Sequence, residues 1–321
     1  MQPALSILIP TQGRMPQLQQ LLDSLAGLGN REEIPHEIIV ANNAQDKTTA
    51  TAVEALLEHY RSQEPERWVH VRELIRGKSR ALNRLIPLAQ ANILAFLDDD
   101  VEVAPEWLKM TWQFFCEHSY DVMQGSILIP PSMQNDERFR GLLNRYRTIC
   151  YYSKPGLEVH EIVSLNAANM ALRRELLDVT GLFDERIGPG ASGTSMDVEF
   201  GERVLRAGRR IGYEPRSIVY HDVDWSRLTE EYFKQRHELQ GRSRAIYKQS
   251  SVLSSFANLL RAALGWCWYA ALRNERKIYR SKGRVYHYRA MLKEATRRSA
   301  AALIWPSTRS TSVAVIKRKT L

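Results

Sequence analysis

Residues 92–100 read Asn-Ile-Leu-Ala-Phe-Leu-Asp-Asp-Asp, an apolar run that ends abruptly in three consecutive aspartates. A continuous apolar run of this length is typical of a strand buried on both faces of a sheet. Three adjacent carboxylates repel one another unless a cation neutralises them, and Mg²⁺ or Mn²⁺ prefers such oxygen ligands. We therefore expect a buried strand with a charged site at its end. The alternative is a solvated acidic turn that caps the following helix.

Similar apolar runs precede residue 92 and alternate with helical patterns. The expected elements are strands at 5–10, 37–41 and 68–71, and helices around 18–25, 48–61 and 79–89. Such alternation predicts a parallel sheet covered by helices on both faces, with ligands bound outside the carboxyl ends of the strands. The loops that follow these strands cover 10–14, 42–46 and 98–100.

Beyond residue 101 the pattern becomes mixed. Residues 130–163 show no regular pattern, and a Gly-rich loop covers 188–193. The other expected elements are strands at 122–129 and 217–220, a compact apolar piece at 169–172, and helices at 105–118, 173–179 and 198–207. We expect an α/β body over 1–226, a helical extension over 227–305, and a disordered basic tail over 306–321.

The 321 residues are 44% hydrophobic and 25% charged, which is the balance of a soluble globular protein. No segment approaches the roughly 18 uninterrupted apolar residues of a membrane-spanning helix. The first 14 residues lack the features of a secretory signal. The three cysteines are far apart, which favours neither a disulfide framework nor a metal cluster. We expect a cytoplasmic protein.

The net charge of +9 is unevenly distributed. Residues 227–321 hold 21 Lys/Arg against 5 Asp/Glu, a net charge of +16, which leaves −7 for residues 1–226. A basic C-terminal third on a mildly acidic body indicates an anionic partner, either a membrane surface or a nucleic acid.

Three further features could contribute chemistry. Gly77-Lys78-Ser79-Arg80 begins an expected helix, where backbone N–H groups and cations suit phosphate; the alternative is a solvated helix face. Asp197 lies at another helix start, where a carboxylate stays ionised and could act as a general base, or could simply cap the helix. His221 follows an apolar strand, and a lone histidine is more often structural.

In this order and spacing, the motifs resemble those of the family 2 glycosyltransferases, which are nucleotide-sugar enzymes of the GT-A fold. The resemblance covers about residues 4–248. It rests on Ser6–Thr11, Glu37–Asp46, Gly77–Asn83, Phe96–Asp100, Ala168–Arg174 with Gly181–Glu185, and Met196–Phe200. It implies a Rossmann-like mixed sheet of the spore-coat-polysaccharide-synthase type, with a nucleotide-sugar half over 1–100 and an acceptor half over 101–226.

The resemblance also implies roles for individual residues. The nucleotide-sugar would contact Pro10, Thr11, Arg14, Asn42, Asn43, Lys78, Asn83, Asp98 and Asp99. The metal, Mg²⁺ or Mn²⁺, would be held by Asp98, Asp100 and His221. Asp197 would be the catalytic base of an inverting transfer, and the acceptor would contact Asn169, Met170, Met196 and Glu199.

Three positions depart from the family pattern. Asn42 replaces the usual Asp of the second-strand loop. UDP is the expected nucleotide, but asparagine can hydrogen-bond a base through its oxygen or its NH₂ group, so GDP and dTDP stay open. Met196 replaces the Glu that usually precedes the catalytic Asp, which raises the alternative of a sugar-nucleotide-binding protein with weak or lost catalysis. Gln12-Gly13-Arg14 stands where Tyr-Asn-Arg is common.

The extension separates this chain from polymer-making relatives. Gln235-Arg236-His237 lacks the tryptophan of the processive Gln-x-x-Arg-Trp motif, so we expect transfer of a single sugar.

Residues 252–272 form an apolar-rich helix followed by a basic cluster, so residues 252–298 suit an anionic membrane surface. The alternative is that this helix packs on the body or on a second copy of the chain. We expect a peripheral enzyme at the cytoplasmic face of the inner membrane, acting on a glycan or lipid-linked acceptor for a cell-surface polysaccharide. Nucleic-acid binding through the tail is a further alternative, although no nucleic-acid motif is present.

Overall fold

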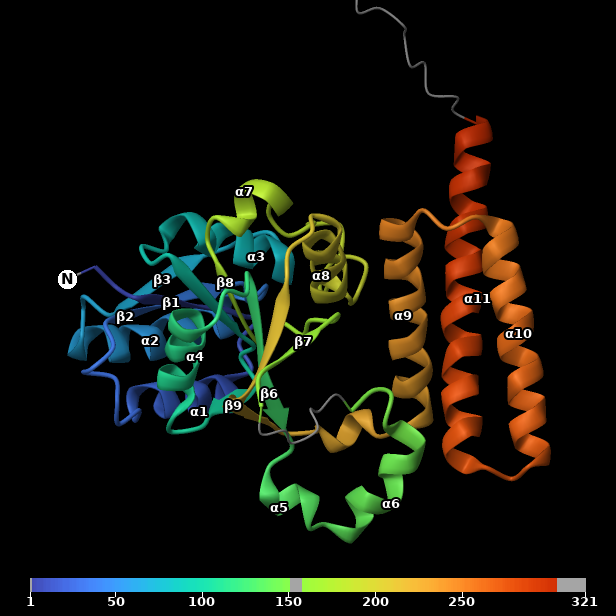
Figure 1. The fold of residues 1–321 in the computed structure, drawn as a ribbon, viewed down its shortest axis with the longest axis horizontal. Coiled ribbons are helices and arrows are strands. Elements are labelled where there is room, and N and C mark those ends of the chain that lie inside the picture. Colours follow the sequence, from blue (N-terminus) through green and yellow to red (C-terminus); the bar gives the residue numbers. More distant parts are fainter. Residues whose placement is uncertain (1, 151–157, 305–321) are drawn as a thin grey trace, which may run out of the picture.

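The computed structural model describes residues 2–150 and 158–304. Within them, nine strands form one sheet in the order β3-β2-β1-β4-β8-β6-β9-β5, with β7 paired to β9 (Figure 1). The strands are β1 (Leu5–Thr11), β2 (His36–Asn42), β3 (Trp68–Arg72), β4 (Ile93–Leu97), β5 (Val101–Val103), β6 (Val122–Leu128), β7 (His160–Ile162), β8 (Asn169–Arg173) and β9 (Ile211–His221).

Helices cover both faces of this sheet and form the C-terminal extension. They are α1 (Met15–Ala26), α2 (Lys47–Gln63), α3 (Lys78–Leu85), α4 (Trp107–Glu117), α5 (Pro131–Gln134), α6 (Glu137–Tyr146), α7 (Leu176–Thr180), α8 (Met196–Arg206), α9 (Glu230–Lys248), α10 (Val252–Ala271) and α11 (Glu275–Ile304), with 3-10 turns η1 (Ile86–Leu88) and η2 (Trp225–Arg227). The predicted basic tail, 306–321, lies outside the described residues.

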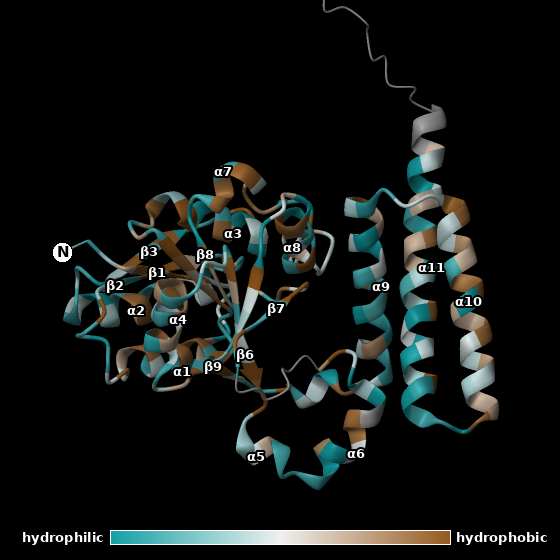
Figure 2. Ribbon diagram, viewed as in Figure 1, coloured by the Kyte–Doolittle hydropathy of each residue, from teal (hydrophilic) through white to brown (hydrophobic). Residues whose placement is uncertain are grey.

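The sheet is mixed. Strands β3, β2, β1 and β4 are parallel, as the apolar runs predict, whereas β8 is antiparallel to both β4 and β6. Side chains of β1 alternate between two cores: Ile7 and Ile9 pack with α1, α2 and α4, while Leu8 packs with α3, α7 and α8. Both faces of a strand such as β1 are therefore buried, which explains why most of its residues are apolar. In the ribbon of Figure 2, several strands of the sheet carry the brown of hydrophobic residues.

A third, smaller core attaches the extension to the body. The rings of Tyr146 in α6, Phe233 in α9 and Tyr279 in α11 contact one another with centroids 5.7–5.9 Å apart. Helix α6 lies in the stretch that the sequence predicts to be irregular. From this attachment α9, α11 and α10 stand side by side, with α10 farthest from the sheet (Figure 1).

Candidate active site

The three aspartates follow β4 at the carboxyl end of the parallel strands, next to the end of β1. The Thr11 hydroxyl donates to Asp99 Oδ2 at 2.7 Å, and the Arg14 guanidinium lies 2.9 Å from Asp99 Oδ1. Asp99 is buried, and this burial raises its pKa although the charge of Arg14 opposes the shift. Asp99 therefore ties two strand ends together and presents little of itself to a ligand.

Asp100 has strong partners at one carboxylate oxygen and none at the other. The β5–β9 pairing places His221 opposite Val101, so His221 Nε2 lies 3.4 Å from Asp100 Oδ2, which Arg14 also contacts. Burial opposes ionisation of Asp100, but the hydrogen bond and charge of His221 and the charge of Arg14 outweigh it and hold its pKa well below the usual range. The other oxygen, Oδ1, is buried and has no hydrogen-bond partner among the described residues. Asp100 is thus an ionised carboxylate with an unused acceptor.

Lys78 approaches the aspartates from the start of α3, where it pairs with Asp98. Burial disfavours the ammonium, but the charge of Asp98 raises the pKa above its ordinary value, so the side chain is cationic. The Gly-rich loop holds this helix start, since the Lys78 N–H donates to Pro189 O at 2.9 Å. A Cβ on Gly190 would lie 2.8 Å from Gly77 Cα, so only glycine permits this close approach.

Asp197 enters the same pocket from the first turn of α8. Ser195, which precedes this helix, has a φ of 69°, a left-handed conformation that turns the chain into it. Asp197 Oδ2 accepts from the Ala167 N–H at 3.3 Å, and its Oδ1 accepts from the Val198 N–H at 2.9 Å. The pocket has a volume of about 420 Å³ and is lined by Arg14, Lys78, Asp98, Asp100, Asp197 and His221 among others. The cations Arg14 and Lys78 and the carboxylates of Asp98, Asp100 and Asp197 thus line one cavity.

Comparison with known proteins identifies the family of this chain. The model of glycosyl transferase family 2 matches residues 6–181, more than half of the chain. The chain belongs to glycosyl transferase family 2. The Pre-mycofactocin glycosyltransferase of Mycobacterium tuberculosis, in strains CDC 1551 / Oshkosh and ATCC 25618 / H37Rv, is 25% identical over 147 residues, or 46% of this chain. The match spans 30% of that relative's length.

Two solved structures share the fold. A mannosyltransferase from Pyrobaculum calidifontis, PcManGT in complex with GDP-Man and Mn²⁺, aligns with a TM-score of 0.53 and 18% identity over 95% of this chain and 76% of its own. TarS 1-349 of S. aureus aligns with a TM-score of 0.50 and 16% identity over 92% of this chain and 91% of its own. The family 2 chain therefore has the GT-A fold, as the motifs predict.

A divalent cation fits this family 2 site if the substrate completes its coordination. Within 2–150 and 158–304, no three His, Cys, Asp or Glu side chains form a group that could hold a metal ion. Of the predicted ligands, Asp98 is paired with Lys78 and His221 with Asp100, whereas Asp100 Oδ1 is buried and has no partner among the described residues. Mg²⁺ and Mn²⁺ commonly take one or two carboxylates and share the remaining positions with phosphate oxygens and water.

Two predicted nucleotide residues have side chains that are already engaged. Asn42 donates to Ala50 O at 2.9 Å and accepts from Ala44 N–H and Arg72. Asn43 donates to two carbonyls of residues 73–75 and accepts from Gly77 N–H at 3.0 Å. Both are buried. These amides hold the loop that leads to Lys78, so a direct contact with a nucleotide would come from the loop backbone.

Other predicted residues also hold the scaffold in place. Asn83 bonds the backbone of Phe183, and Asn169 is buried between Trp107, Ser126 and Ser217. Met170 packs in the sheet core. Glu199 forms a two-bond pair with Arg203 at 2.7 and 2.9 Å. Of the predicted acceptor residues, Met196 does line the pocket, where its sulfur accepts from the Ser79 hydroxyl at 3.6 Å.

The pocket also includes residues that the sequence interpretation missed. Asn166 and Ala168 precede β8, and α9 contributes Tyr232, Gln235, Arg236 and Leu239. The available signal was Gln235-Arg236, the remnant of the Gln-x-x-Arg-Trp pattern. Its position in the pocket makes α9 part of the site and not only part of the extension.

Proposed function

We propose that this chain is a metal-dependent, inverting glycosyltransferase that transfers one sugar from a nucleoside-diphosphate sugar to an acceptor hydroxyl. UDP is the proposed nucleotide, with GDP as the competitor because the similar mannosyltransferase structure holds GDP-Man. The acceptor is a lipid-linked glycan for a cell-surface polysaccharide. The observation that carries the proposal is the shared pocket, which is lined by Asp100, cationic Lys78 and Asp197 together.

The charged side chains of the pocket support binding of the donor's diphosphate. Asp100, with His221 beside it, would hold Mg²⁺ or Mn²⁺, and the bound metal would neutralise charge on the departing nucleoside diphosphate. Lys78 and Arg14 add fixed positive charge near the same oxygens, each held in place by an aspartate. Asp99, which accepts a hydrogen bond from Thr11, holds Arg14, and Asp98 holds Lys78, so little reorganisation is needed when a diphosphate binds.

The acceptor half follows from Asp197. Asp197 lies in the first turn of α8 and lines the pocket, so its carboxylate is placed to accept the proton of an acceptor hydroxyl. That hydroxyl oxygen then bonds to the anomeric carbon as the bond to the diphosphate breaks. One carboxylate and one displacement invert the configuration at this carbon. Single-sugar transfer is supported by the missing tryptophan after Gln235-Arg236.

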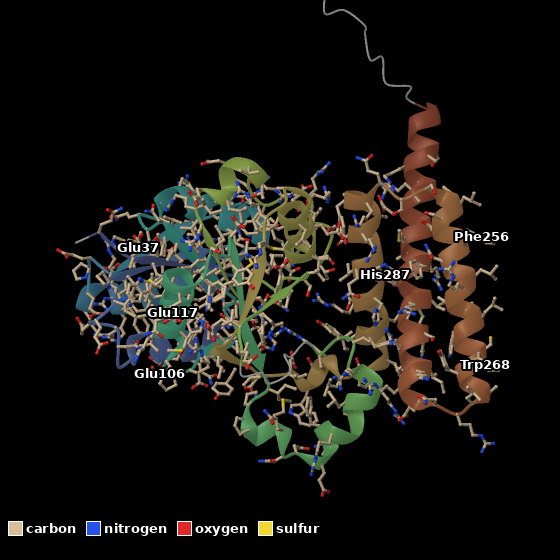
Figure 3. The ribbon with its side chains drawn as sticks, viewed as in Figure 1. Glu37, Glu106, Glu117, Phe256, Trp268 and His287 are labelled. Atoms are coloured by element: carbon tan, nitrogen blue, oxygen red, sulfur yellow. The ribbon has the colours of Figure 1, made fainter. Side chains whose placement is uncertain are left out.

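Helix α10 supports a peripheral site on an anionic membrane. Six apolar side chains spaced three or four residues apart lie on one face, with exposed fractions between 52% and 78%: Leu253, Phe256, Leu260, Leu264, Trp268 and Leu272. Phe256 and Trp268 point away from α11 in Figure 3. No helix in the described part of the chain is long and apolar enough to cross a bilayer. The cations that follow the stripe, at 273–284, suit anionic headgroups.

Calorimetric titration tests the proposal. UDP, GDP and dTDP are each titrated with and without Mn²⁺ into wild type, Asp100→Ala and the control Asp178→Ala, an exposed aspartate of α7 outside the catalytic pocket. We expect one nucleotide to bind at least about tenfold more tightly with metal, and Asp100→Ala but not Asp178→Ala to remove that gain. Failure of every nucleotide to bind would contradict the proposal. Metal-dependent binding without turnover of any sugar would instead favour the alternative of lost catalysis.

A further inference from the structure

A second pocket of about 420 Å³ lies between α9 and α11. It shares Gln235 and Leu239 with the catalytic pocket, so the two cavities are neighbours along one side of α9. Leu239 also packs against Gly193, four residues before Asp197. The second pocket therefore adjoins the catalytic pocket next to the loop that leads to Asp197.

The walls of this pocket carry an excess of positive charge. Its lining includes five cations, Lys234, Arg242, Arg289, Lys293 and Arg297, and two acids, Glu238 and Glu294. None of the five cations forms an ion pair with a residue in the described ranges. Elsewhere in the extension, cations do find partners: Lys248 pairs with Glu202, and Lys282 with Glu230. The positive charge of this pocket is thus not neutralised from within the described protein.

The arrangement on α11 concentrates this charge. Arg289, Lys293 and Arg297 recur every four residues, so they lie on one face of the helix, and all three are exposed. Like charges at this spacing repel one another and destabilise a helix. A multivalent anion placed between α9 and α11 would remove that repulsion. Arginine favours phosphate, because its planar fork can donate two hydrogen bonds to neighbouring oxygens.

We propose that the pocket between α9 and α11 binds phosphate groups of the acceptor while its sugar hydroxyl reaches Asp197. This inference rests on the proposed glycosyl transfer and deepens it, because it assigns a chemical class to the acceptor. The phosphate could be the diphosphate of a lipid carrier or a phosphate within the glycan. The donor diphosphate has a separate site at Lys78 and Asp100.

The test measures binding of inorganic pyrophosphate to the full chain by calorimetry, in EDTA and at low salt. One variant removes the pocket cations of α11: Arg289→Gln, Lys293→Gln and Arg297→Gln. The matched control, Arg276→Gln, Arg280→Gln and Arg284→Gln, removes three exposed cations at the same spacing on the same helix, outside the pocket. We expect at least about a tenfold loss of affinity in the pocket variant and less than about a twofold change in the control.

Equal affinity for pyrophosphate in the wild type and the pocket variant would overturn the inference, because the pocket cations would then not bind the anion. An equal loss of affinity in the pocket variant and the control would also overturn it, because only general positive charge would then matter. Farnesyl diphosphate and glucose 6-phosphate, used as further probes, separate a lipid-linked source from a phosphate within the glycan. The nucleotide titration is independent of this result. If a nucleotide binds with metal but the pocket variant keeps its pyrophosphate affinity, the proposed function stands and the phosphate site fails. If the pocket variant loses its pyrophosphate affinity but no nucleotide binds, the phosphate site stands and the proposed function fails.

Discussion

Asp197 and Glu199 lie two residues apart at the start of α8, yet they have different surroundings. Asp197 lines the catalytic pocket, whereas Glu199 is buried in its pair with Arg203. We predict that Asp197→Asn lowers kcat by about 10²- to 10⁴-fold, because a general base contributes roughly that factor. Nucleotide affinity should stay within about twofold of wild type. Transfer assays with the donor sugar identified by titration, together with calorimetry on the variant, measure both quantities.

Glu199→Gln is the matched control on the same helix. It leaves the Arg203 guanidinium without its charged partner, so we expect the free energy of unfolding to fall by about 1–3 kcal/mol while kcat changes little. Urea unfolding and the same transfer assay distinguish the two variants. A large loss of kcat in Glu199→Gln with an intact Asp197→Asn enzyme would reverse the assignment of the base.

Single residues also show what sequence motifs can and cannot predict. Asp98, Asp100, Lys78, Asp197 and His221 line one pocket because each follows a strand or begins a helix, and such ends meet at one edge of the sheet. Buried asparagines are different. The sequence cannot show whether a side-chain amide is free for a ligand or is used by the backbone of a neighbouring loop, and the structure shows the amides of Asn42, Asn43 and Asn169 in use.

At the scale of elements, the packing of α9 on α11 depends on two glycines. A Cβ on Gly241 of α9 would collide with the His287 carbonyl of α11, and one on Gly283 of α11 would meet the His237 ring. We predict that Gly241→Ala lowers the free energy of unfolding by about 1–3 kcal/mol, because overpacking forces the helices apart. Urea unfolding measures the loss.

The control for this substitution is Gly265→Ala in α10. A Cβ there lies 3.7 Å from Ser281 Oγ, which is ordinary contact. Since alanine favours helix over glycine, this variant should be as stable as wild type or more stable by up to about 1 kcal/mol. Equal effects of the two substitutions would mean that helix propensity, and not the close approach of α9 to α11, determines their stability.

The exposed stripe of α10 gives a second prediction at this scale. Phe256→Ser with Trp268→Ser should weaken binding to phosphatidylglycerol-containing vesicles by at least about tenfold, because two large apolar side chains no longer enter the interface. Vesicle flotation measures this binding.

Leu74→Ser with Val163→Ser removes two exposed apolar residues elsewhere and should have no effect on flotation. Unchanged flotation of the α10 variant would contradict membrane docking. If the α10 substitutions instead abolish a dimer in sedimentation, the stripe contacts a second copy of the chain.

Elements with a strong pattern could be predicted from the sequence, and those defined by long-range contacts could not. The strands β1, β2 and β4 each contain an apolar run, and their predicted boundaries agree with the structure within two residues. Strand β5 has three residues and forms only by pairing with β9, so its own sequence gives no periodic signal. Helix α6 depends on aromatic contacts with α9 and α11, which lie more than 80 residues away.

For the molecule as a whole, two buried histidines link stability to pH. His237 and His287 lie between α9 and α11, where burial lowers the pKa of each to about 4. The side chain of Gln240 hydrogen-bonds His237, and the Thr148 hydroxyl lies 3.0 Å from His237 Nε2. The positive charge of Arg236 disfavours protonation of His237, and that of Arg244 disfavours protonation of His287. Unfolded histidine titrates near pH 6.5, so below that pH the unfolded chain binds protons that the folded chain does not.

The stabilising effect of these neutral rings is therefore complete above about pH 6.5 and is lost as the pH falls toward 4. Each histidine should lower the free energy of unfolding by at most about 1.4 kcal/mol per pH unit within that window. Urea unfolding at several pH values measures the slope. The variant His237→Gln with His287→Gln should flatten it, whereas His59→Gln, which replaces an exposed histidine of α2, should not. An unchanged slope in the double variant would exclude this origin of acid sensitivity.

The order in which the extension is stacked has a consequence for acceptor length. Helix α9 borders the catalytic pocket, α11 packs on α9, and α10 packs on α11 with its apolar stripe outward. Packed helices have axes 8–10 Å apart, so with α10 seated on lipid the reacting hydroxyl would sit roughly 20 Å above the headgroups. The three helices would then set the distance between the membrane surface and the catalytic pocket. The reacting hydroxyl would then reach Asp197 either on a glycan several units long or when the carrier diphosphate leaves the headgroup level for the pocket between α9 and α11.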